Sequence, residues 1–232
     1  MLSVIIPTYN EGGCIRTTIQ KLWQHDTASL VQEIIICDGG SRDGTIQGAK
    51  AEGVTVIRCI KKGRAAQMNA GARMARAPVL YFLHADTIPP PGFSTDIQKA
   101  VQEGIAAGCY RLAFDYAHWF LKANCWFTRF DVDAVRFGDQ SLFVKKESFH
   151  KTGGFCENHL VLEDQELVKR LKNIGLFKVL PKAVITSARK YRENGIFKTQ
   201  GIFFLIYLLY RLGFSQEKLV AVYRRLIKQD KI

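Results

Sequence analysis

The sequence predicts an α/β protein with a mostly parallel central sheet flanked by helices. Short apolar runs alternate along the chain with segments whose apolar residues recur at helical spacing, as strands and crossover helices require. The apolar runs show no polar alternation, which is typical of strands buried on both faces of a sheet. At 232 residues and 47% hydrophobic content, the chain is also long enough for one domain with a full core.

The first half of the chain contains four strand-like runs: LSVIIP (2–7), EIIICD (33–38), the weaker VTVIRC (54–59) and VLYFLH (79–84). The segments between them have helical spacing: 13–25, 43–53 and 65–75. After residue 105 we expect three further strands: 106–114, 140–146 and 177–181. A helix is expected at 162–175, where it ends on Gly175. With no internal repeat or low-complexity linker, one domain over residues 1–190 and a helical tail over 191–232 are expected.

Composition restricts the classes of partner. Thirty-three Lys and Arg against 21 Asp and Glu give a net charge of +12, which favours phosphorylated substrates, nucleic acid or acidic lipid. The cations are dispersed and no nucleic-acid-binding motif is present, which argues against nucleic acid. The six cysteines lack metal-site spacing, so we interpret them as reduced thiols. The first residues show no basic leader or cleavage pattern, and we expect a cytoplasmic protein.

Polar segments follow the expected strands, at the sheet edge where open α/β sheets bind ligands. They read PTYNEGG (7–13), CDGGSRDGT (37–45), KKGRAAQMN (61–69) and HADT (84–87). Asp38 could accept hydrogen bonds from a base or ribose, or it could shape a turn together with Ser41 and Asp43. Asp86 could bind a divalent cation on a diphosphate, or it could be a turn residue ahead of three prolines. The basic KKGR stretch, which includes Arg64, would supply positive charge for phosphate.

Five segments resemble, in order and spacing, the family 2 glycosyltransferases of the GT-A fold: SVIIPTYNE (3–11), EIIICDGGSRDGT (33–45), GRAAQMNAGA (63–72), YFLHADT (81–87) and LEDQELVKRL (162–171). The resemblance covers about residues 2 to 190. It implies an inverting, metal-dependent enzyme that moves a sugar from a nucleoside diphosphate, UDP, to an acceptor hydroxyl. The nucleotide-binding half would span about 1–90 and the acceptor half about 91–190. GDQ and HADT are also similar to a bacterial subgroup labelled arsenosugar-biosynthesis or radical SAM-associated transferases.

The resemblance also implies roles for individual donor-side residues. It assigns the nucleoside to the first loop and the aspartate after the second strand: Pro7, Thr8, Glu11 and Asp38. Arg64 is expected at the diphosphate. The last aspartate of the family's D-x-D motif, a ligand of Mn²⁺ or Mg²⁺, corresponds to Asp86. This chain departs from the family in two places, with His84 at the first position of that motif and Gly39 in place of the second aspartate of DDGS.

An inverting transfer needs one carboxylate near the acceptor hydroxyl to accept its proton. The ED motif of the family assigns this role to Asp164, with Glu163 beside it on the acceptor side. Both residues open the helix at 162–175, where the helix dipole stabilises negative charge. The alternative is ordinary first-turn ion pairing with Lys169 and Arg170.

The segment FGDQSLFVKKESFHKTGGF (137–155) resembles the part of the family that shapes the acceptor side of the pocket. It implies acceptor-side roles for Asp139 and Gln140. A hydrogen bond that closes the loop is the alternative for both residues.

The tail contains GIFFLIYLLYRLGF (201–214), which is apolar nearly all round and interrupted by Arg211. Its apolar run is shorter than the ~20 residues that span a bilayer. It could pack as a final helix against the sheet domain, form the face of a homodimer, or contact a membrane peripherally through residues 196–214 at the inner face of the membrane. A non-catalytic basic module that binds a membrane surface or nucleic acid is the alternative function. A dinucleotide-dependent redox enzyme is disfavoured because no G-x-G-x-x-G follows the first strand.

Overall fold

The computed structural model describes residues 1–132 and 140–228, and within them eight strands form one sheet of order β3-β2-β1-β4-β7-β6-β8-β5. Four strands on one side run parallel: β1 (Leu2–Thr8), β2 (Val31–Asp38), β3 (Thr55–Arg58) and β4 (Val79–Phe82). The other side contains β7 (Leu142–Lys145), β6 (Ala107–Phe114), β8 (Phe177–Thr186) and β5 (Thr87–Ile88). Of the described strands, β7 and β5 run against the rest. The predicted mostly parallel sheet is therefore confirmed.

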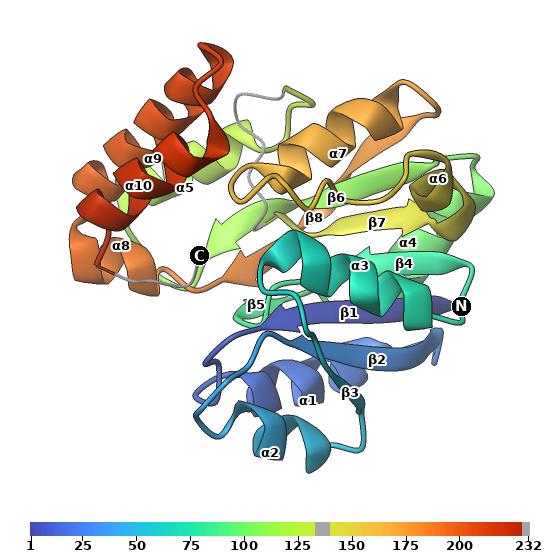
Figure 1. Ribbon diagram of the computed structural model, residues 1–232. Coiled ribbons are helices and arrows are strands. Elements are labelled where there is room, and N and C mark those ends of the chain that lie inside the picture. Colours follow the sequence, from blue (N-terminus) through green and yellow to red (C-terminus); the bar gives the residue numbers. More distant parts are fainter. Residues whose placement is uncertain (133–139, 229–232) are drawn as a thin grey trace.

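Helices cover both faces of the sheet (Figure 1). One face packs against α1 (Ile15–His25), α2 (Thr45–Lys50) and α4 (Phe93–Gln102). The other face packs against α3 (Arg64–Met74), α6 (Lys146–Lys151) and α7 (Glu163–Lys172). Adjacent strand residues belong to different layers, with Val4 in the first core and Ile5 in the second, because side chains alternate across a strand. The uninterrupted apolar runs of the sequence follow from this double coverage.

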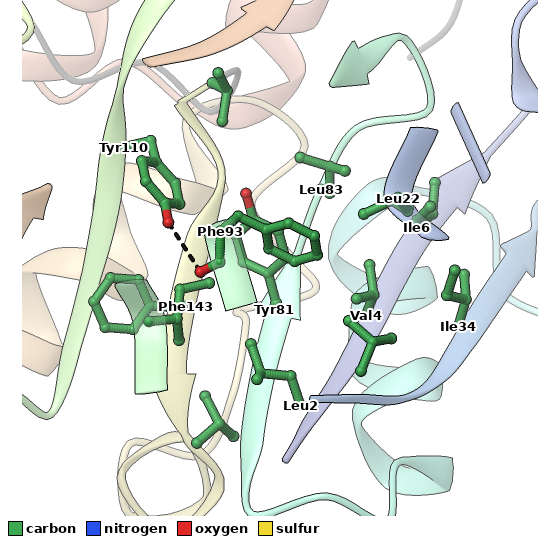
Figure 2. Packing of buried hydrophobic residues seen from close by; sticks show 14 of the residues in the cluster. Leu2, Val4, Ile6, Leu22, Ile34, Tyr81, Leu83, Phe93, Tyr110 and Phe143 are labelled. Atoms are coloured by element: carbon green, nitrogen blue, oxygen red, sulfur yellow. Dashed lines mark hydrogen bonds between the residues drawn. The ribbon is translucent and has the colours of Figure 1, made fainter. Parts of the chain in front are cut away.

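Aromatic side chains fill the first core where the two halves of the sheet meet (Figure 2). The rings of Tyr81 and Phe93 stack with centroids 5.5 Å apart. The hydroxyl of Tyr110 donates to the carbonyl oxygen of Phe93 at 3.0 Å, so the buried phenol keeps a hydrogen-bond partner. This packing fixes α4 against the sheet and joins the parallel side to the strands that follow.

The tail forms α8 (Arg189–Asn194), α9 (Ile196–Arg211) and α10 (Gln216–Leu226). In Figure 1 these helices lie at one end of the sheet, beside α5 (Trp119–Phe127). Ile202 and Ile206 of α9 pack with Leu219 of α10 and with Val161, which precedes α7. Packing on the sheet domain is thus found for one face of α9. None of the helices in residues 1–132 and 140–228 has the length and apolar character needed to cross a membrane.

Strand β8 differs from the sequence expectation, because it continues to Thr186 rather than ending at Pro181. Its pairing with β6 slips at the proline: Tyr110 pairs with Leu180, and Arg111 pairs with Ala183. Proline cannot donate to a strand ladder and is accommodated at such an irregularity. The helices α4, α5 and α6 were not predicted at all.

Candidate active site

A cavity of about 220 Å³ opens where β1 and β4 end, at the carboxyl edge of the parallel strands. Its walls come from the loops after these strands, from the start of α3, and from α8, α9 and α10. The predicted donor-side residues that line it are Pro7, Thr8, Glu11, Arg64 and Asp86. His84 lines it as well. The cavity therefore brings together residues from three of the four polar segments: 7–13, 61–69 and 84–87.

Hydrogen bonds tie the loop after β1 to the loop after β2. The backbone N–H of Asn10 donates to the Ser41 hydroxyl at 2.9 Å, and the Asn10 side-chain oxygen accepts from the Arg42 N–H at 3.0 Å. The Gly12 N–H donates to the Asp43 carboxylate at 2.9 Å. Burial by itself raises the pKa of Asp43, but hydrogen bonds from its neighbours outweigh burial and hold that pKa below its usual range. The loop after β1, which lines the cavity, is thus held in place by the loop after β2.

Asp38 lies at the end of β2 with its side chain fully buried. Its carboxylate accepts the backbone N–H groups of Gly40 at 2.9 Å and Ser41 at 3.0 Å, and the Thr8 hydroxyl lies 3.4 Å away. Asp38 is not among the described residues that line the cavity. The structure favours the turn-shaping alternative, and contact between Asp38 and a nucleoside stays a prediction.

Gln67 of α3 lies beneath these loops and was missed as a functional residue. Its amide donates to the carbonyl oxygens of Thr8 at 2.8 Å and Cys37 at 2.6 Å, and its side chain lines the cavity. A Cβ atom at Gly39 would lie 3.0 Å from the Gln67 amide nitrogen. Gln67 therefore leaves little room for a side chain at residue 39.

The loop that carries Asp86 is held from two sides. The Thr18 hydroxyl donates to the carbonyl of Ala85 at 2.6 Å, and the backbone N–H of Ser187 donates to the carbonyl of Asp86 at 3.2 Å. Burial first, and then the negative charges of Glu11 and Asp86, raise the pKa of the Cys14 thiol to about 12. Glu11 and Asp86 therefore both act on Cys14, and both carboxylates line the cavity.

This carboxylate environment fits a metal ion that is held largely by a substrate. Within the described ranges, no group of three or more His, Cys, Asp or Glu residues is arranged to enclose a metal. Mg²⁺ is commonly held by only one or two carboxylates together with substrate phosphates. Asp86, which lines the cavity close to Glu11, meets that requirement.

Cations line the cavity together with these carboxylates. Arg64 Nε lies 2.8 Å from Glu163 Oε1, and Arg189 Nη2 lies 3.5 Å from Glu11 Oε2. Lys190 also lines the cavity, and its Nζ lies 5.6 Å from the ring centre of Phe203. Arg189 and Lys190 were not predicted as site residues, because they follow β8 and that strand was expected to end earlier. Together with Arg64 they add positive charge to the cavity wall.

The first turn of α7 lies at the rim of the cavity, where Leu162 and Gln165 line it. Between them Asp164 is half-buried, and Glu163 is only 1% exposed. Glu163 pairs with Arg64 from behind the cavity wall, so its predicted contact with an acceptor stays a prediction. The first-turn pairing with Arg170 that the sequence allowed is made instead by Glu166.

Gln140 is buried with its amide directed at backbone carbonyls. It donates to Tyr110 at 3.3 Å and to Thr128 at 3.4 Å. The structure therefore favours the loop-closing alternative for Gln140. Asp139 lies outside the described residues.

Aromatic side chains from the tail complete the cavity: Tyr191, Phe203, Tyr207 and Tyr223, with Phe114 of β6. Residues 191–228 are thus part of the cavity wall, although the sequence predicted a separate tail. The division into a domain over 1–190 and a tail over 191–232 stays a prediction. The cavity wall contains residues from both parts.

The sheet, its strand order and a cavity at the carboxyl edge define a protein of the GT-A fold. A model of the family described as "Glycosyl transferase family 2" matches residues 3–155, and the chain belongs to that family. The match confirms the family that the motifs indicated. The bacterial subgroup stays a prediction.

Three similar proteins illustrate the range of the relationship. The validoxylamine A glucosyltransferase of Streptomyces hygroscopicus subsp. jinggangensis (strain 5008) is 31% identical over 106 residues, which are 43% of this chain and 25% of that relative. A mannosyltransferase from Pyrobaculum calidifontis in complex with GDP-Man and Mn²⁺ matches 97% of this chain and 69% of its own, with a TM-score of 0.69 and 15% identity. Glucosyl-3-phosphoglycerate synthase from Mycobacterium tuberculosis, in complex with Mn²⁺, UDP and phosphoglyceric acid, matches 93% of this chain and 79% of its own, with a TM-score of 0.65 and 19% identity.

Proposed function

We propose that the protein is an inverting, metal-dependent glycosyltransferase that moves a sugar from a UDP-sugar to an acceptor hydroxyl. The observation that carries the proposal is that Asp86, Glu11, Arg64 and Arg189 all line the same cavity, with Arg189 Nη2 3.5 Å from Glu11 Oε2. A nucleoside diphosphate bound to a divalent cation needs this combination, a carboxylate for the metal and cations for the phosphate oxygens.

The donor would bind against the loop after β1, which the loop after β2 supports. Pro7 and Thr8 line the cavity there, and the hydrogen bonds between the loops fix their backbone before the donor arrives. Arg64 is held by Glu163, so its guanidinium would meet the diphosphate with little further ordering.

Asp86 would hold Mn²⁺ or Mg²⁺ at the diphosphate. When bound, the ion neutralises charge that develops on the leaving UDP. Both solved structures described above are complexes with Mn²⁺, one with UDP and the other with GDP-Man. This supports the metal and leaves the choice of base to experiment.

Asp164 is the proposed general base. In a single displacement the acceptor oxygen bonds to the anomeric carbon on the face opposite the diphosphate, while the carbon–oxygen bond to UDP breaks. The acceptor proton passes to the Asp164 carboxylate, and UDP leaves with the electron pair. The helix dipole at the start of α7 favours the ionised carboxylate before this transfer.

Calorimetric titration of UDP tests the donor site most directly. We expect UDP to bind in the presence of Mn²⁺, to bind much more weakly with a chelator, and to lose its Mn²⁺-dependent binding in Asp86→Ala. The matched control is Glu147→Ala, which removes an exposed carboxylate paired with Lys151 on α6. If neither UDP nor GDP binds with metal present, the proposed function is wrong.

A further inference from the structure

Helix α9 presents two apolar faces, and only one of them is covered. Ile202 and Ile206 are buried against α10 and the loop before α7. On the other side, Phe197, Phe204, Leu208 and Leu212 are 44% to 66% exposed. At 100° per residue these four side chains fall on one stripe of the helix. A soluble helix ordinarily turns such a stripe toward the protein, so this one indicates a binding surface.

Helix α5 extends the exposed stripe. Trp119 is 68% exposed, and its ring centre lies 6.2 Å from that of Phe197. Phe120 packs against Phe197 at 4.8 Å, and Asn124 donates to Gln200 at 3.2 Å, so α5 and α9 are fixed side by side. We call Trp119, Phe197, Phe204, Leu208 and Leu212 the α5–α9 face.

Positive charge is concentrated in the part of the chain that contains α9. Residues 189–228 contain nine Lys and Arg and two Glu, a net charge of +7, while the whole chain carries +12. The exposed cations next to the apolar stripe are Lys122 on α5 and Lys198 and Arg211 on α9. An apolar stripe bordered by cations is complementary to a surface with negative headgroups over hydrocarbon.

We propose that the α5–α9 face docks on the surface of an anionic lipid bilayer. Aromatic residues such as Trp119 and Phe204 suit the boundary between headgroups and acyl chains, with α9 lying in the plane of that boundary. A second copy of the chain fits less well, because it would bring two strongly cationic surfaces together. Docking of this kind needs no helix that crosses the bilayer.

The opposite side of α9 lines the cavity through Phe203, Ile206 and Tyr207. An α-helix with its side chains is about 10 Å thick. Docking would therefore bring the bilayer surface within roughly one helix width of the cavity. Resting on the proposed function, this geometry points to an acceptor anchored in that membrane.

Vesicle co-sedimentation tests the docking proposal. The wild-type protein is mixed with vesicles of phosphatidylcholine alone or of equal parts phosphatidylcholine and phosphatidylglycerol. We expect strong binding to the anionic vesicles only, and a loss of at least ~10-fold in the partition coefficient for Phe204→Gln with Leu208→Gln. The matched control is Ile174→Gln with Leu176→Gln, which replaces two exposed apolar residues just after the C-terminal end of α7 and should bind as the wild type does.

A second variant, Lys198→Gln with Arg211→Gln, leaves the apolar stripe intact and should reduce the preference for anionic over neutral vesicles. The proposal is overturned if the wild type does not bind the anionic vesicles, or if Phe204→Gln with Leu208→Gln binds them equally well. It is also overturned if the wild type is a dimer that this variant dissociates, because the face would then join two copies. Titration with UDP in the absence of vesicles is independent of all these outcomes, so the two proposals can fail separately.

Discussion

Replacement of Arg64 by methionine is expected to lower the stability of the protein, because it breaks an ion pair with a buried carboxylate at the cavity wall. Arg64 Nε lies 2.8 Å from Glu163 Oε1, and the Glu163 side chain is only 1% exposed. Methionine keeps the length and the apolar stem of the side chain but removes the charge. The buried carboxylate would then lose its partner.

The distance sets the scale of the effect. At an effective dielectric constant of ~20, two unit charges 2.8 Å apart attract by about 6 kcal/mol. The guanidinium side is 36% exposed, so solvent screens part of this attraction. Loss of one partner from a fully buried pair costs about 3–5 kcal/mol, and with this exposure we expect a loss of about 2–3 kcal/mol.

Urea unfolding measures this loss, and the chain offers a matched control. Arg16 pairs with Glu52 at the same 2.8 Å distance, but its side chain is 64% exposed. Arg16→Met should cost less than about 1 kcal/mol. Adding Glu163→Gln to Arg64→Met should recover part of the stability, since it removes the unpaired charge. If Arg64→Met and Arg16→Met lower the free energy of unfolding equally, burial of Glu163 does not increase the cost of losing its partner.

Three further changes test the site and the core. Asp164→Asn should lower kcat by ~100-fold or more with UDP affinity unchanged, and equal kcat would exclude Asp164 as the base. Gly71→Ala should lower the free energy of unfolding in urea by about 2 kcal/mol, because the added Cβ would lie 2.5 Å from a β1 side chain. A Cβ at Gly201 would meet nothing within 4 Å, so Gly201→Ala should not destabilise the protein. Similar losses for the two variants would contradict the packing argument. Although burial raises the pKa of Glu33, hydrogen bonds led by the Arg76 N–H hold it below the ordinary 4.5. This stabilisation is present above pH 4.5 and is lost as pH falls through the lowered pKa. Glu33→Gln should therefore lower the free energy of unfolding by about 1–3 kcal/mol near neutral pH, and by less in acid. A loss that does not change with pH would refute this dependence on the Glu33 carboxylate.

The fold could be predicted where local pattern and final environment agree. The first four strands are continuous apolar runs because helices cover both faces of the sheet there. Strand β8 was cut short because Pro181 normally ends a strand, whereas here a slip in pairing accommodates it. Helix α4 was missed although Phe93, Ile97 and Ala100 recur at helical spacing, because the three prolines before it were interpreted as a redirected loop.

The donor side of the site could be predicted because its residues directly follow strands. Arg189 and Lys190 also follow a strand, and a correct end for β8 would have identified them. The direction of a side chain is a different matter, since no local pattern shows that the Gln140 amide points at the carbonyl of Tyr110. Likewise, nothing near the aromatic residues of α9 and α10 indicates that they line the same cavity as the end of β1.

The cavity wall extends from Pro7 on the first strand to Tyr223 on the last helix. During synthesis the ribosome must therefore release almost the whole chain before the cavity can exist. A nascent chain that has completed β1 to β4 has the loop after β1 but not yet the aromatic wall. Any ligand that fills the cavity adds its binding free energy only to the state in which α8 to α10 have docked, and so draws the last-made helices onto the first-made strands.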